Sequence, residues 1–258
     1  MELAIVAVAF FASLLTFFAG FGLGTLLLPI FAIFFPPETA VALTAIVHFL
    51  NNIFKLGLVG KHINKKILLQ FGIPAVIAAF FGAKLLTELV SNPPIYNYNL
   101  FSGSFQITPI NLVVGLLMFI FAILELFSIL KKWQFGKNML WLGGVLSGFF
   151  GGLSGHQGAM RSAFLVKAGL GKEAFIATGV AVSCFVDVVR ISIYSSKFAS
   201  GSWSEKWEIL LLAVIAAFAG ALLGKKLLNK TKIQSLYLFV AVALMVFGLL
   251  LAGGVLAK

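Results

Sequence analysis

Residues 151–158 read Gly-Gly-Leu-Ser-Gly-His-Gln-Gly, a glycine-rich stretch inside an apolar segment that runs from residue 138 to residue 169. A second long apolar segment, residues 3–35, is interrupted in the same way by Gly20-Phe-Gly22-Leu-Gly24. Glycine tracts break helices because each glycine costs backbone entropy and leaves the backbone exposed. We therefore expect each of these two segments to form two half-helices joined by non-helical backbone.

The composition of the chain places these segments in a membrane. Of the 258 residues, 61% are hydrophobic and 10% are charged, whereas a soluble domain carries about 45–50% apolar and about 25% charged residues. The sequence does not alternate apolar and polar residues as the strands of a membrane barrel do. We therefore predict an all-α polytopic protein of the plasma membrane, surrounded by lipid. Its apolar segments are 3–35, 38–60, 65–90, 109–130, 138–169, 172–197, 205–228 and 233–257.

The charged residues and the metal-ligating residues exclude several classes of function. Lys and Arg total 19 against 8 Asp and Glu, and they lie in short runs between apolar segments. This pattern is typical of orientation signals and lipid headgroup contacts rather than of nucleic-acid binding. The single cysteine, Cys184, excludes an internal disulfide, and with three histidines in the chain it argues against a metal site. We predict no metal, no cofactor and no nucleic-acid partner.

The two halves of the chain repeat each other. Residues 75–80 read AVIAAF and recur at residues 213–218. The Gly-Ala pair at 82–83 recurs at 220–221. Because both halves also contain a glycine break, we predict that the chain arose by duplication.

Polar positions align in the same way. At a nearby offset, Glu38 aligns with Glu173, Asn52 with Asp187, and Lys55 with Arg190. We predict an N-terminal membrane repeat at 1–130 and a C-terminal one at 131–258, integrated into a single transmembrane domain. Each repeat has four apolar segments and starts with a glycine-broken one.

Charge counting separates two topologies for the broken segments. If each broken segment is re-entrant and returns to the side it left, 14 of the 19 Lys and Arg residues lie on the inner side. If each broken segment crosses the membrane fully, 11 of these residues lie on one side and 8 on the other. The positive-inside rule favours the re-entrant topology. It makes the repeats inverted, an arrangement common in secondary transporters. Full crossing is the alternative, since a first arm of about 17 residues is long enough to span.

The starts of the second half-helices are candidate binding groups. They begin near Thr25 and Ala159, and each exposes unpaired backbone N–H groups with about half a positive charge. In hydrocarbon such groups are tolerated where they line a cavity or bind a ligand. Two starts related by a pseudo-twofold axis would form one anion site near the midplane, with close packing at small residues as the alternative. The expected substrate-binding residues here are Gly22, Gly24, Thr25, Ser154, Gly155, His156, Gln157, Gly158 and Arg161, of which Arg161 is the strongest single ligand.

A polar stripe adds further candidates. In segment 38–60 the spacing places Thr44, His48, Asn51, Asn52 and Lys55 on one helical face, and in segment 172–197 it does the same for Gly179, Ser183, Asp187 and Arg190. We assign His48, Asn51 and Asn52 to substrate binding, and assign to a supporting polar network Thr44, Lys55, Ser183, Asp187 and Arg190. A satisfied Asp187–Arg190 ion pair is an alternative role for those two. Lys55 and Arg190 could also snorkel from helix ends.

Two further features have alternative interpretations. The uncharged connection 91–109 is rich in Pro, Asn and aromatic residues. We expect a loop at the level of the outer headgroups, with a lid as the alternative. Residues 152–155 fit the G-x-S-G of rhomboid intramembrane proteases, in which Ser154 would need a histidine base such as His48.

The glycine motifs resemble those of a known family. Residues 17–29 (FFAGFGLGTLLLP), residues 148–159 (GFFGGLSGHQGA) and the four-plus-four duplication resemble the sulfite exporter TauE/SafE family over the whole chain. The second motif departs from the family pattern, because Ala163 stands near the place of the proline that Pro29 keeps in the first.

The resemblance implies a transporter rather than an enzyme. Its partner would be a small sulfur oxyanion or organosulfonate, such as sulfite or sulfoacetate, moved outward by alternating access. The oligomeric state is left open, with a homodimer as one of the alternatives. The alternatives are a proton-coupled anion importer, in which His48 or His156 titrates, and the rhomboid-like protease.

Overall fold

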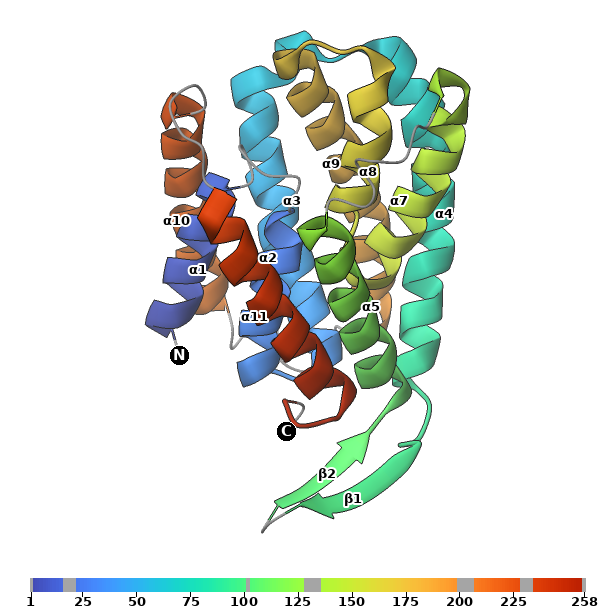
Figure 1. The fold of residues 1–258 in the computed structure, drawn as a ribbon, viewed down its shortest axis with the longest axis vertical. Helices are drawn as coiled ribbons and strands as arrows, with labels where there is room; N and C mark the ends of the chain where they lie inside the picture. Colours follow the sequence, from blue (N-terminus) through green and yellow to red (C-terminus); the bar gives the residue numbers. More distant parts are fainter. Residues whose placement is uncertain are drawn as a thin grey trace.

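The computed structural model describes residues 2–15, 22–100, 103–127, 136–198, 207–227 and 234–256. They form almost only helices (Figure 1), and the predicted all-α polytopic fold class is confirmed. The helices are α1 (Glu2–Leu15), α2 (Leu23–Phe34), α3 (Pro37–Val59), α4 (Lys65–Val90), α5 (Pro109–Leu126), α7 (Leu140–Ser154), α8 (Gly158–Leu165), α9 (Lys172–Phe198), α10 (Trp207–Leu227) and α11 (Gln234–Ala252). Short 3₁₀ turns cover Gly60–His62, Lys137–Met139 and Val166–Ala168.

The connection between α4 and α5 is the exception to the helical fold. It forms an antiparallel hairpin of β1 (Tyr96–Leu100) and β2 (Gly103–Ile107), in which Tyr96 lies opposite Ile107. The sequence predicted a loop here. The difference is explained by the tyrosine, phenylalanine and isoleucine side chains of this stretch, which favour extended backbone.

The helices differ in length in a way that bears on crossing a membrane. Among the described residues, five are long and apolar enough to span: Pro37–His62, Lys65–Val90, Pro109–Leu126, Lys172–Ser196 and Trp207–Lys226. By contrast α1, α2 and α7 have 14, 12 and 15 residues. At about 1.5 Å per residue, none of these three reaches across a hydrocarbon core of about 30 Å.

The short helices form two hairpins that enter the bundle from opposite ends. α1 packs on α2, and both open toward the lower end of Figure 1. α7 packs on α8, and both open toward the upper end. Gly20 and the lysines at positions 131, 132, 230 and 232, on which the first predicted break and the charge count partly depend, lie outside the described residues.

Two long helices, α3 and α9, pack against each other in opposite directions at the centre of the bundle (Figure 1). The end of α3 lies beside the start of α9, because His62 Nε2 is 3.0 Å from Glu173 Oε2. Just beyond it, the backbone N–H of Asn64 donates to Thr178 Oγ1 at 3.0 Å. The antiparallel course brings the middle of α3 next to the middle of α9.

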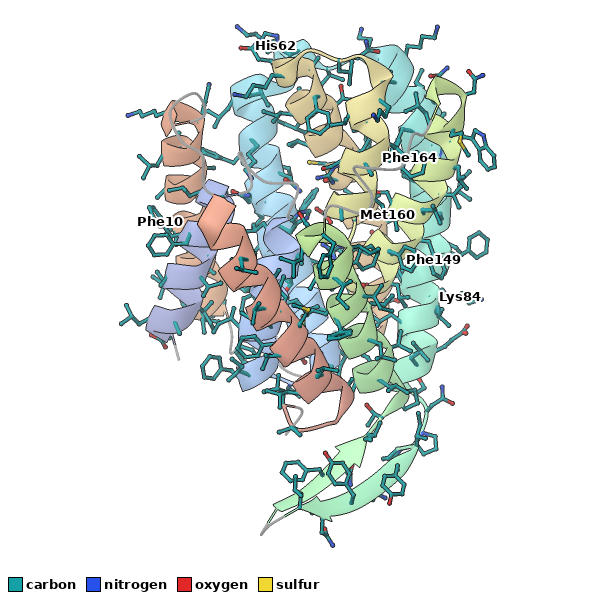
Figure 2. The ribbon with its side chains drawn as sticks, viewed as in Figure 1. Phe10, His62, Lys84, Phe149, Met160 and Phe164 are labelled. Atoms are coloured by element: carbon teal, nitrogen blue, oxygen red, sulfur yellow. The ribbon has the colours of Figure 1, made fainter. Side chains whose placement is uncertain are left out.

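The two halves exchange equivalent contacts. α4 packs on α7, and α10 packs on α1. A Cβ placed on Gly82 of α4 would overlap the Phe149 carbonyl of α7, and a Cβ on Gly220 of α10 would overlap the Phe10 carbonyl of α1. Figure 2 shows Phe10 and Phe149 on opposite sides of the bundle. Gly82 and Gly220 are the glycines that the predicted repeat aligns, and each packs against a helix from the other half of the chain.

The lateral surface of the bundle is apolar. On α4, the exposed side chains Leu69, Ile73, Ile77 and Phe81 follow one another at every fourth residue, so they form one stripe along the helix. Figure 2 shows side chains that project outward along both edges of the bundle in this view. Lipid tails are as apolar as these side chains, so a bilayer accommodates a surface that water would not.

Candidate functional site

The break between α7 and α8 is built on Gly155. α7 ends at Ser154, and Gly155 adopts a left-handed backbone with φ +82°. Its N–H still closes the last turn of α7 on the Gly151 carbonyl at 3.0 Å. A Cβ on Gly155 would lie 2.7 Å from Nη1 of Arg190. Glycine is therefore required here both by backbone conformation and by the close approach of a guanidinium.

The starts of α2 and α8 meet at this break. A Cβ placed on Gly22, which precedes α2, would lie 4.0 Å from Cα of Gly158, the first residue of α8. A Cβ on Gly24 would lie 3.4 Å from the Gly155 carbonyl oxygen and 3.8 Å from Cδ2 of His48. The positive ends of the two helix dipoles thus face one another inside the bundle.

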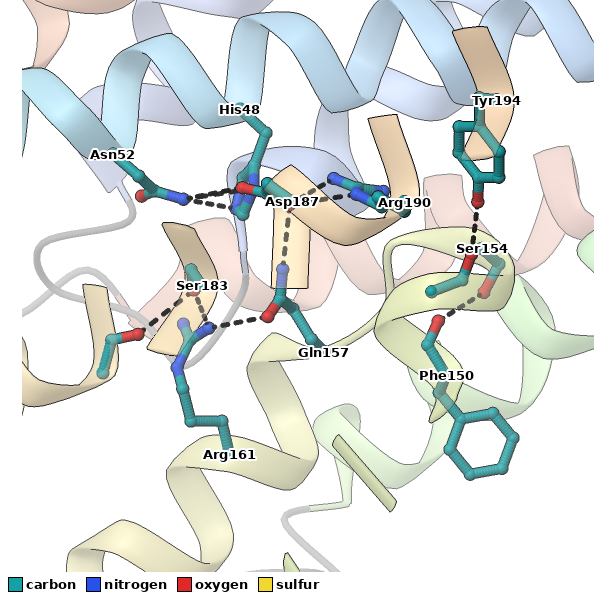
Figure 3. Close-up of polar contacts among 12 residues, drawn as sticks. His48, Asn52, Phe150, Ser154, Gln157, Arg161, Ser183, Asp187, Arg190 and Tyr194 are labelled. Atoms are coloured by element: carbon teal, nitrogen blue, oxygen red, sulfur yellow. Dashed lines mark hydrogen bonds and ion pairs between the residues drawn. The ribbon is translucent and has the colours of Figure 1, made fainter. Parts of the chain in front are cut away.

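The carboxylate of Asp187 lies at the centre of the polar side chains beside this break (Figure 3). Arg190 donates to Asp187 Oδ1 from Nε at 2.9 Å and lies 2.8 Å away through Nη2. Gln157 Nε2 donates to the same oxygen at 3.3 Å. On the other oxygen, His48 Nδ1 lies at 2.6 Å and Asn52 Nδ2 donates at 3.3 Å. The predicted Asp187–Arg190 ion pair is confirmed, and it is part of a larger network.

Arg161 borders the network from α8. It donates to Ser183 Oγ, and its Nη1 lies 3.5 Å from Gln157 Oε1. Gly179, one turn before Ser183, leaves room for it, because a Cβ there would lie 3.2 Å from Arg161 Nε. Arg161 is half-buried, whereas Asp187 and Arg190 are 0% exposed. Two guanidinium groups against one carboxylate leave this group of residues with an excess of positive charge.

Several buried donors at the break have no hydrogen-bond partner among the described residues. They are Thr44 Oγ1, His156 Nε2 and the two Nη atoms of Arg190, of which Nη2 is ion-paired with Asp187 Oδ1. The His156 ring is held by Ser154 Oγ, 2.9 Å from Nδ1, and stacks on Phe121 with ring centroids 5.6 Å apart. Unpaired buried polar atoms are costly, so this is where an added acceptor would gain most.

The structure divides the polar stripe of α3 into two groups. His48 and Asn52 contact α9, as expected of binding candidates. Asn51 instead lies 3.0 Å from Ser13 Oγ of α1. With its amide nitrogen donating to the Ala217 carbonyl at 3.2 Å, its oxygen accepts from Lys55 Nζ at 3.1 Å. Asn51 therefore faces α1 and α10, and it holds the ammonium of Lys55.

Two sequence expectations need correction at this point. Lys55 and Arg190 do not reach lipid headgroups, because they are 4% and 0% exposed. Each is held inside the bundle by a partner, Asn51 for Lys55 and Asp187 for Arg190. The alternative pairing of Ser154 with His48 is also not formed, since Ser154 donates to the Phe150 carbonyl at 3.3 Å and His48 lies against Asp187.

Two buried residues beside the break, Tyr194 and Ser147, were not predicted from the sequence. Tyr194 is 1% exposed and donates from its hydroxyl to the Gly152 carbonyl. Ser147 Oγ donates to the Gln157 carbonyl at 3.1 Å, which secures the break. Spacing alone could have found Tyr194, since it follows Asp187 by seven residues on one helical face. No group of three or more His, Cys, Asp or Glu side chains able to hold a metal ion occurs within the described ranges.

Comparison with known proteins gives one match. The model of a family described as sulfite exporter TauE/SafE matches residues 5–251. No curated protein and no solved structure matches the chain. The family match covers both glycine breaks, both central helices and every residue of the network described above.

Proposed function

Because the chain belongs to the sulfite exporter TauE/SafE family, we propose that it exports a small sulfur-containing anion of the sulfite, sulfonate or sulfoacetate class. Export takes place across the plasma membrane by alternating access. The observation that carries the proposal is the meeting of the α2 and α8 starts at Gly22 and Gly158, beside a buried cluster with excess positive charge.

The chemistry of such an anion fits the groups at the break. A sulfonate presents three acceptor oxygens and one delocalised negative charge. Helix N-termini supply backbone N–H donors to anions, and the planar guanidinium of Arg161 or Arg190 can donate two parallel hydrogen bonds. The buried Arg190 Nη1 has no hydrogen-bond partner within the described part of the chain and offers a further place for an oxygen, as does His156 Nε2 in the tautomer that carries its proton there.

The fold supports alternating access. We take the two halves, 1–130 and 131–258, to be inverted repeats, each with a re-entrant hairpin that reaches the midplane. The reciprocal contacts at Gly82 and Gly220 support this interpretation. In transporters of this design, one repeat or bundle moves against the other around a fixed central site.

The membrane potential is sufficient to drive export. A monovalent anion that leaves a cell with a negative interior gains about 2.3 kcal/mol per 100 mV. Efflux therefore requires no coupling ion. The alternative is a proton-coupled importer that uses His48 or His156, and the two mechanisms differ in their response to voltage and to pH.

Efflux from preloaded proteoliposomes tests the proposal. The vesicles are loaded with radiolabelled sulfite, methanesulfonate or sulfoacetate, and voltage and pH gradients are imposed separately. Chloride and acetate serve as competing anions, and protein-free liposomes are the control. We expect sulfur-anion efflux that accelerates with inside-negative voltage and persists without a pH gradient. Transport that stops when only the pH gradient is collapsed would favour the importer, and no flux of any of the three anions would reject the assignment. Ser154→Ala should retain transport, whereas a serine protease would lose all activity.

A further inference from the structure

The central carboxylate competes for the same donors that an anionic substrate needs. We infer that Asp187 is a tethered competitor of the transported anion. In the empty carrier its carboxylate occupies the hydrogen-bond donors of the binding site, and it releases Arg190 when the substrate binds. The inference rests on the proposed function and specifies how its site is regulated.

The first support is the set of groups around the carboxylate. Asp187 is 0% exposed and is held by Arg190 at 2.8 Å, by Gln157 at 3.3 Å and by His48 at 2.6 Å. Gln157 immediately precedes α8, and Arg190 approaches Gly155. The donors that hold Asp187 are therefore the same donors that border the meeting point of the two helix starts.

The second support is that some of these donors are not used. Arg190 binds Asp187 through Nε and Nη2, while its buried Nη1 has no hydrogen-bond partner among the described residues. Nη1 is the atom that lies against Gly155. An incoming anion can thus contact Arg190 at Nη1 before it displaces the carboxylate from Nε and Nη2, so that the guanidinium keeps an acceptor throughout the exchange.

The third support is the charge of the empty site. Without Asp187, the guanidinium groups of Arg161 and Arg190 would face each other's charge inside the bundle with no buried counter-ion from this cluster, which is costly in a low-dielectric interior. With Asp187 in place, the net charge of Arg161, Arg190 and Asp187 falls from two positive charges to one, and Arg190 keeps a buried counter-ion when no ligand is bound. The empty carrier can then change conformation at a lower electrostatic cost. The tether therefore favours net efflux over obligatory exchange of one anion for another.

Replacing Asp187 by asparagine tests this inference. Asp187→Asn keeps the shape of the side chain and removes the competing charge. We expect sulfite to bind more tightly by on the order of tenfold, the equivalent of a charge-assisted hydrogen bond. We also expect net sulfite efflux to slow while sulfite–sulfite exchange persists. Asp187→Ser removes the same charge with a smaller side chain. It replaces the asparagine variant in these measurements if that variant does not fold.

Glu173→Gln is the matched control. It also removes a carboxylate of α9 that pairs with a histidine, at 3.0 Å from His62, but at the helix end. It should leave both sulfite affinity and the ratio of exchange to net efflux at parental values. Neutral variants of Asp187 that bind sulfite no more tightly than the parent, or keep the parental ratio, would overturn the inference while leaving the proposed function intact. A parent protein that neither binds nor moves sulfite contradicts the function for that anion, and the inference with it.

Discussion

At the scale of single residues, the buried carboxylate of Asp187 has both local and distant partners. Burial of an ion costs several kcal/mol unless partners compensate. Arg190 compensates Asp187 from the same helix, three residues away, and His48 does so from a position 139 residues away in the chain. The i,i+3 pair could be predicted from spacing. The His48 contact depends on the antiparallel packing of α3 on α9.

Arg161 is the residue with the clearest expected role in binding. It is half-buried and borders the network through Ser183 and Gln157. Loss of one charge-assisted hydrogen bond costs about 1.5–3 kcal/mol, so Arg161→Ala should weaken anion binding by roughly 10- to 150-fold. Arg161→Lys should restore only part of the affinity, because a point charge lacks the planar fork.

Binding titrations on purified variants decide the role of Arg161. Lys167→Ala, which removes an exposed cation just after α8, should bind like the parent protein. If Arg161→Ala also binds like the parent while Arg190→Ala does not, the ligand charge comes from α9 instead of α8.

Gly155 is predicted to be intolerant of any side chain. At φ +82° a non-glycine residue is strained, and a Cβ would lie 2.7 Å from Arg190 Nη1. Gly155→Ala should therefore lower the free energy of unfolding by about 1–3 kcal/mol. Thermal unfolding in detergent measures this loss. Gly171→Ala, at a position with open space around the added Cβ, should show no comparable loss, and equal stability of the two variants would contradict the strained break.

At the scale of elements, the broken helices are held by close backbone contacts. A Cβ on Gly82 or on Gly220 would overlap a backbone carbonyl of α7 or of α1. α7 and α1 cannot move away from these glycines without disturbing the α7–α8 or the α1–α2 hairpin. Each of these hairpins contains one of the two helix starts at the site. Packing at α4–α7 and at α10–α1 therefore positions the site as well as stabilising the bundle.

The two contacts should respond alike to substitution. Overpacking costs about 1–3 kcal/mol, so Gly82→Ala and Gly220→Ala should each reduce stability by an amount in this range and slow transport. Gly57→Ala, whose added Cβ meets nothing within 4 Å, should be neutral or slightly stabilising in its helix. Unfolding and flux assays on the same preparations provide the comparison. Loss of stability at only one of the two glycines would argue against equivalent packing in the two halves.

At the scale of the whole molecule, charge is distributed unequally between the ends of the bundle. The upper end in Figure 1 carries Lys61, Lys65, Lys66, Lys167, Lys172, Lys225 and Lys226 together with Glu173, and the lower end carries Glu2, Glu38, Glu88 and Glu208 with Lys84 nearby on α4. The lysines of α10 and the α3–α4 connection are neighbours there, since Lys225 Nζ donates to the Leu58 carbonyl at 3.2 Å. From the positive-inside rule we predict that the lysine end faces the cytoplasm.

Cysteine labelling tests this orientation. In a Cys184→Ser background, Lys61→Cys and Lys226→Cys should react only with a membrane-permeant reagent in intact cells, whereas Asn97→Cys in the β1–β2 hairpin should react with an impermeant one. All three should react after the membrane is permeabilised, which serves as the control for accessibility. Labelling of Lys61→Cys and Asn97→Cys from the same side would be incompatible with the arrangement.

The sequence by itself determined the properties that depend on local composition and on spacing within one helix. Hydropathy predicted a polytopic helical bundle, the glycine tract at 151–158 predicted the break, and spacing predicted the Asp187–Arg190 pair. These follow from the chain's own covalent neighbours, because helix periodicity and glycine entropy act over a few residues.

Only the tertiary structure decided which faces meet. Sequence placed Asn51, Asn52 and Lys55 on one face, but that face is wide enough to touch two neighbours, so Asn52 meets Asp187 of α9 while Asn51 meets Ser13 of α1. The close pairing of α1 with α10 and of α4 with α7 joins segments from opposite halves of the chain. Such pairings depend on how well whole surfaces fit together, and no short stretch of residues contains that information.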